Sequence, residues 1–209
     1  MATVQRLSPG AVRGTGEALW RTVLALPFRG GTWRQVTYLL LALPVGLGCV
    51  ALALVGGPAG RVQRGLLHRL LGVRIEEPER AGRLLSLLHS VVSLPLNAVA
   101  LAVTCYGWLL VPLNLGWPLR PLIGLGDGDY RLAWGGPTFA GAWAFHAVVG
   151  GVSFLLLMPW LGRGLTTLQA RLATALLGPR RGGAAGPLVL ALLVAAVGAV
   201  LSVAIVHQL

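Results

Sequence analysis

The chain has 209 residues, of which 56% are hydrophobic and only 11% are charged. A soluble domain carries about 25% charged residues. Four stretches contain no Asp, Glu, Lys or Arg: 35–60, 84–119, 132–162 and 182–209. Each is longer than the roughly 20 residues that a helix needs to cross a bilayer. The composition therefore excludes an ordinary soluble domain and predicts an integral membrane protein.

The net charge of +11 comes from 17 basic residues, all of them Arg, against six acids. These arginines lie between the apolar runs, as they do in the cytoplasmic flanks of membrane helices. A nucleic-acid reader would instead carry a basic face on a soluble fold. We therefore expect the lipid bilayer as a partner and no nucleic acid.

The N-terminal part combines a basic segment, residues 1–34, with the first apolar run, residues 36–56. Pro44 lies inside this run and predicts a kink, and Gly56-Gly57-Pro58 ends it. Five arginines precede the run and six follow it before residue 84, so the positive-inside rule does not orient it. Either the N-terminus lies outside, or the run dips into the membrane and returns.

The segment 61–73 predicts an amphipathic interfacial helix. Its apolar positions are Val62, Leu66, Leu67, Leu70 and Leu71, and its polar face carries Arg61, Arg64 and His68. Gly72 is a typical helix end.

The second apolar run, residues 84–112, contains Pro95 and Asn97 and closes in tryptophans typical of an interfacial belt. Residues 113–137 follow as a loop rich in Gly, Pro and aromatic residues, the main extracytoplasmic segment of the expected topology. If a stimulus is read outside the cell, its exposed polar and aromatic groups are the candidate ligand residues. They are Asp127, Asp129, Tyr130, Arg131 and Trp134.

The third run, residues 138–160, ends at Pro159-Trp160, and leucines then recur at helical spacing. We expect a second interfacial helix that turns along the membrane surface. Its leucines would lie in the acyl boundary and its arginines among the headgroups. The leucines are Leu161, Leu165, Leu168, Leu172 and Leu176, and the arginines are Arg163 and Arg171.

The fold class predicted is an all-α, polytopic transmembrane helical bundle. It has three clear spans, a Pro-kinked first span of uncertain topology and two amphipathic interfacial helices. Gly178-Pro179 breaks the last amphipathic helix, and residues 187–207 form the final run. The expected organisation is a basic segment (1–34), a transmembrane domain (35–178), and a linker with a C-terminal transmembrane helix (179–209).

Three segments resemble a family. WRQVTYLLLALPVGL (33–47) is similar to the opening of the sensor domain of actinobacterial membrane proteins. QRGLLHRLLGV (63–73) and MPWLGRGLTTLQARLATALLG (158–178) resemble the segments that close its first and second helical pairs. The resemblance covers about residues 33–178.

The resemblance implies four helices in two pairs and a place before a histidine-kinase transmitter in two-component signalling. The chain departs from it twice. About one helix is missing between Leu54 and Arg61, and an apolar run follows Gly178 where a kinase would begin. The resemblance therefore implies a sensor whose output domain is a separate protein.

No catalytic pattern is present in the sequence. It contains no GxxxxGK[ST], HExxH or GxSxG motif, and GxGxxG does not occur before a helix. His89 and His146 lie in apolar runs, where a pair could hold a metal or haem, but snorkelling or a helix–helix hydrogen bond also accounts for them. We therefore predict no enzyme, no cofactor and no metal.

The sequence thus predicts a non-catalytic, multi-pass sensor of the plasma membrane that passes a stimulus to a separate signalling partner, such as a histidine kinase. The alternative is a transporter or permease subunit, and a second copy of the chain is a further candidate partner. The candidate interfacial and output surface consists of Trp160, Arg163, Arg171, Arg61 and Arg64.

Overall fold

The structure is a computed structural model that describes residues 20–77, 83–124, 129–179 and 185–206. Over these residues it is all α-helical, as the sequence predicts. A helical turn at residues 20–25 leads into the main elements. These are η1 (Leu26–Phe28), α2 (Gly30–Leu54), α3 (Ala59–Leu71), α4 (Arg83–Leu115), η2 (Trp117–Ile123), α5 (Phe139–Phe145), η3 (His146–Val152), α6 (Ser153–Leu177) and α7 (Ala185–Val206).

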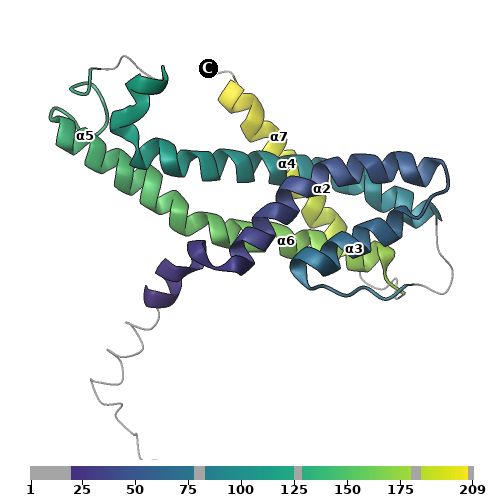
Figure 1. The fold of residues 1–209 in the computed structure, drawn as a ribbon. Helices are drawn as coiled ribbons and strands as arrows, with labels where there is room; N and C mark the ends of the chain where they lie inside the picture. Colours follow the sequence, from purple (N-terminus) through teal and green to yellow (C-terminus); the bar gives the residue numbers. More distant parts are fainter. Residues whose placement is uncertain (1–19, 78–82, 125–128, 180–184, 207–209) are drawn as a thin grey trace, which may run out of the picture.

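Helix α4 is the centre of the bundle, and α2, α3, α6 and α7 all contact it. Figure 1 shows α4 and α6 as two long neighbouring helices, with α2 and α7 crossing them. Two contacts set the direction of α2: the rings of Trp33 and Trp108 lie 5.0 Å apart, and Arg83 donates to the Gly56 carbonyl. The start of α2 therefore lies near the end of α4, and the two helices are antiparallel.

The first apolar run does not dip and return, because α2 continues unbroken through Pro44 to Leu54. The chain reverses in the turn that follows, and α3 runs back along α2 as a separate helix. Gly72 ends α3 in the left-handed conformation, with φ of 71°, as the sequence predicts.

The amphipathic segment after Trp160 is not a separate interfacial helix. Helix α6 passes through Pro159 without interruption and ends at Leu177, before the predicted break at Gly178. Together with α5 and η3 it forms one helical segment, Phe139–Leu177, of 39 residues. The seven residues of η3 are π-helical, a feature that the sequence does not indicate.

The predicted leucine stripe faces protein and not the acyl boundary. Leu168, Leu172 and Leu176 are buried in a core cluster with Leu96 of α4 and Ala191 of α7. Only Leu161 of the stripe is exposed, at 38%. The same correction holds for α3, whose Leu67 is 1% exposed in a second core cluster with α2, α4 and α6.

Three helical segments are long and apolar enough to cross a membrane: Gly30–Leu54, Arg83–Leu115 and Phe139–Leu177. Helix α7 is apolar as well over Ala185–Gly198. The first run, whose topology the sequence left open, is therefore one of the three, and the last run forms α7, which is helical over 22 residues. At about 1.5 Å per residue, Phe139–Leu177 is roughly 58 Å long, well beyond the hydrocarbon core of about 30 Å.

Gly46 of α2 packs closely on α4. A Cβ placed there would lie 3.1 Å from Asn97 Nδ2 and 3.3 Å from Leu94, whereas one at Gly48 would meet nothing within 4 Å. We predict that Gly46→Leu lowers the unfolding free energy by about 1–3 kcal/mol through overpacking. Gly48→Leu, on the exposed side of the same helix, serves as the control. Thermal unfolding in detergent measures both, and equal melting temperatures for the two variants would contradict this packing.

Candidate functional site

An aromatic pocket of about 490 Å³ lies beyond the end of α4. Trp117 stacks on the His146 ring at 5.1 Å and lies 5.7 Å from Phe139, whose ring in turn meets the edge of Tyr130 at 5.8 Å. Asp129 and Arg120 also line the pocket. Its size, aromatic walls and few charged groups are typical of a small-molecule site.

Local hydrogen bonds hold the elements around this pocket. The last carbonyls of a helix have no intrahelical partners. At the end of α4, Trp143 Nε1 donates to the Leu115 carbonyl at 2.9 Å, and Arg120 Nε donates to that of Leu113 at 3.1 Å. At the start of α5, the Thr138 hydroxyl accepts from the Gly141 N–H. These bonds tie η2 and α5 to α4, which fixes Trp117 opposite Phe139.

Only some residues of the predicted ligand loop line this pocket. Asp127 lies outside the described residues. Asp129 and Tyr130 line the pocket, and Asp129 also accepts a hydrogen bond from the Arg131 N–H. Arg131 lies over the Tyr130 ring, and Trp134 stacks on Phe145, but neither lines the pocket.

Sequence reasoning missed the other pocket residues. The sequence predicts tryptophans such as Trp117 as interfacial residues, and nothing in the spacing of His146, Phe139 and Arg120 brings them together. The π-helical η3 contributes His146 directly. Such π-helical turns are frequent at functional sites, which adds weight to the pocket.

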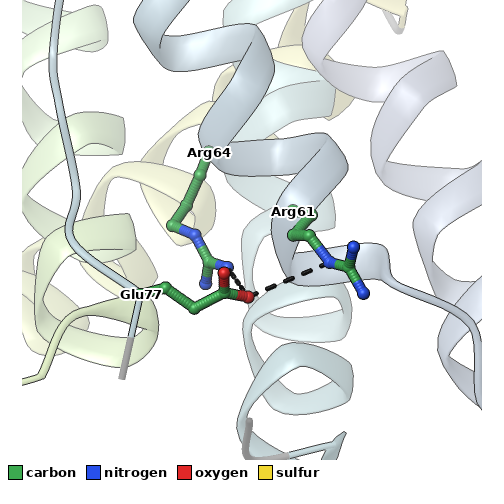
Figure 2. Close-up of polar contacts among 3 residues, drawn as sticks. All are labelled: Arg61, Arg64 and Glu77. Carbon is green, nitrogen blue, oxygen red and sulfur yellow. Dashed lines mark hydrogen bonds and ion pairs between the residues drawn. The ribbon is translucent and has the colours of Figure 1, made fainter. Parts of the chain in front are cut away.

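Two of the five predicted output residues lie on α3 and the other three on α6. Figure 2 shows Arg61 and Arg64 of α3 directed at Glu77, with Arg64 at 2.7 Å and Arg61 at 3.9 Å from one carboxylate oxygen. The Arg64 side chain is 12% exposed, whereas that of Arg61 is 72% exposed. Arg64–Glu77 therefore holds the chain after α3 in place, and Arg61 contributes little to that contact.

The remaining output residues lie on α6. Arg163 stacks over the Trp160 ring at 5.5 Å, and both are exposed. Arg171 faces a different place, a groove that it shares with Arg34 of α2. The predicted output surface is therefore not one surface. Arg61 and Arg64 lie on α3, Trp160 and Arg163 form a pair on α6, and Arg171 lines the groove.

A chain of amide hydrogen bonds crosses the middle of the bundle. Asn97 Nδ2 of α4 donates to the Ala42 carbonyl of α2 at 3.1 Å, and Gln169 Nε2 of α6 donates to Asn97 Oδ1 at 2.7 Å. Because the carbonyl can only accept, it fixes the orientation of both amides. Gln169 lines a cavity of about 20 Å³, and its Oε1 is buried without a hydrogen-bond partner among the described residues.

A second chain of hydrogen bonds lies at the start of α4, and its Gln63 and His89 line the same cavity. The Ser90 hydroxyl donates to the Ser86 carbonyl at 2.7 Å, so it accepts from Gln63 Nε2 of α3 at 2.9 Å. Gln63 Oε1 is then left to accept from His89 Nδ1 at 2.8 Å. His89 therefore carries a proton on Nδ1. The sequence pointed to His89 and Asn97 but gave no signal for Gln63 or Gln169, which lie on amphipathic segments.

The two membrane histidines do not form a pair. His89 bonds Gln63 near the start of α4, whereas His146 stacks on Trp117 beyond its end, roughly 40 Å away along the helix. His146 Nδ1 donates to the Ala142 carbonyl at 2.8 Å, a local helical bond. Within the described parts of the chain, no group of three or more His, Cys, Asp or Glu side chains is placed to hold a metal.

The polar chain predicts the tautomer of His89. We expect ¹⁵N NMR of the selectively labelled protein in lipid to show a protonated Nδ1 and a bare Nε2 for neutral His89. Gln63→Met removes the acceptor and should shift the Nδ1 resonance, while Gln35→Met on α2 should leave it unchanged. A proton on Nε2 in the unmodified protein would contradict the hydrogen-bond order.

Comparison with known proteins gave no match. No family model, curated protein or solved structure matches the chain. Evidence for its function therefore comes from its own residues and their arrangement.

Proposed function

We propose that the protein is a non-catalytic, multi-pass sensor in the cell membrane, similar in kind to the sensor domain family that its sequence resembles. The aromatic pocket receives a ligand from the envelope or the membrane. The exposed Trp160–Arg163 pair and the arginines of α3 contact a separate signalling partner, such as a histidine kinase. In this proposal the chain holds the input and the transmission helix, and its partner supplies the output.

One observation carries the proposal: Phe139–Leu177 is a continuous helical segment. Its first turns supply Phe139 and His146 to the aromatic pocket, and its later turns carry Trp160 and Arg163. A packed helix shifts as a unit, so a small displacement at one end is transmitted to the other.

The pocket is tested by comparing two tryptophans. We predict that deleting the gene in the native host abolishes a transcriptional response to envelope stress. Trp117→Ala should fail to restore the response, because Trp117 forms the pocket wall. Trp134→Ala, outside the pocket and 77% exposed, should restore it. Equal restoration by both variants, at matched membrane levels, would refute the pocket as the input site.

The partner is tested in native membranes. Cross-linking of the intact protein followed by mass spectrometry should recover a histidine kinase or another membrane signalling protein. Recovery of a transporter subunit in its place, or of no signalling protein, would contradict the sensor proposal.

A transporter or permease subunit is the second candidate, favoured by the buried polar chains. Buried polar groups among apolar helices often line a substrate or proton path. Here, His89, Asn97 and Gln169 converge on a cavity of about 20 Å³, the size of one water. The sensor proposal predicts no proton flux above that of empty vesicles in proteoliposomes under an imposed potential. A flux that Gln169→Leu abolishes would overturn it in favour of transport.

A further inference from the structure

A second large depression lies on another part of the bundle, away from the aromatic pocket. This basic groove, of about 750 Å³, is bordered by the start of α2, the end of α3, the second half of α6 and the first residues of α7. None of the described residues that line it is acidic. Arg34 of α2 and Arg171 of α6 both line it.

The two arginines differ in how they are held. Arg34 donates to the Arg69 carbonyl at the end of α3 at 2.7 Å, which anchors its guanidinium and leaves donors free. Arg171 is exposed and has neither a hydrogen bond nor an ion pair with any described residue. The described acids Glu76 and Glu77 do not line the groove. Its two positive charges are therefore not neutralised by the described part of the chain.

The start of α2 adds hydrogen-bond donors. Its first backbone N–H groups belong to Gly30 and Gly31, the helix has no capping side chain among the described residues, and its first turn contains no acid. Open space surrounds both glycines, and Gly31 lines the groove. The positive end of the helix dipole thus adds to the charge of the two arginines.

The remaining lining is suited to a lipid. Thr167 and Thr174 line the groove, and the other residues beside the arginines are mainly aliphatic. They are Leu70, Leu71, Val73, Ala170, Ala175 and Pro187. The groove also borders α2 and α6, which belong to the segments apolar enough to cross a membrane.

From these features we infer that the groove binds one anionic phospholipid. Arg34, Arg171 and the start of α2 hold its phosphodiester headgroup. The aliphatic residues contact the first carbons of its chains. A zwitterionic headgroup fits less well, because its ammonium would face two arginines with no acid beside them. The site is independent of any signalling role and requires only that the protein lies in a bilayer.

Native mass spectrometry of the intact chain tests the inference. The protein is reconstituted with equal amounts of phosphatidylglycerol and phosphatidylcholine carrying the same acyl chains. Phosphatidylglycerol should be retained preferentially by the unmodified protein. Arg171→Gln should reduce the preference roughly fivefold, the effect of one basic residue beside an anionic lipid surface. Arg163→Gln, which removes an exposed arginine of the same helix outside the groove, should leave the preference unchanged.

Three results would overturn the inference: equal retention of both lipids, an equal loss in Arg163→Gln and Arg171→Gln, or full displacement of the lipid by excess inorganic phosphate. The last would show a site for free phosphate. If Arg171→Gln does not fold, the unmodified protein still decides, because raised salt should weaken the preference and a salt-independent preference would exclude charge recognition.

Discussion

The arrangement of the bundle depends on one hydrogen-bonded chain, from Gln169 through Asn97 to the Ala42 carbonyl. It joins α6, α4 and α2 through three residues that are all buried. Interhelical side-chain hydrogen bonds between membrane helices are worth only about 0.6 kcal/mol on average. Their larger effect is on register, since a slip of one helical turn would leave buried amides without partners. Apolar packing alone tolerates many helix registers, and these hydrogen bonds select one of them.

The helix register that Asn97 sets determines which residues of the other helices contact the two ends of α4. Toward its start, α3 is brought against α4 so that Gln63 reaches both His89 and Ser90. Toward its end, Gly150 and Gly151 of η3 pack so closely on Asn114 and Leu115 that a side chain on either glycine would clash. This close approach places His146 against Trp117 and closes one wall of the aromatic pocket. Pocket and polar chains are thus products of the same helix alignment.

The sequence predicted the helices well, because apolar length and helix-ending residues are local properties. Gly72, Gly178 and the Gly56-Gly57-Pro58 turn all end helices where expected. It did not predict what covers each apolar face. A leucine stripe has the same spacing whether lipid or protein packs against it, so the burial of Leu172 by α4 and α7 could not be read from α6 alone. Likewise, Gln63 and Gln169 look like ordinary polar residues of amphipathic helices, and only the tertiary arrangement buries them.

The charged residues also show what the sequence alone does not reveal, and they distinguish the basic groove from the aromatic pocket. Arginines are simple to count, but their roles depend on partners that the sequence does not identify. Arg64 is held by Glu77, Arg163 lies on Trp160, and Arg34 is anchored at the end of α3. The aromatic pocket, in contrast, carries Asp129 and Arg120 together and is nearly balanced in charge. Because an uncompensated charge attracts anions and a balanced aromatic pocket favours small amphiphilic molecules, the two depressions select different chemistries. Residues of the continuous helical segment Phe139–Leu177 line both depressions.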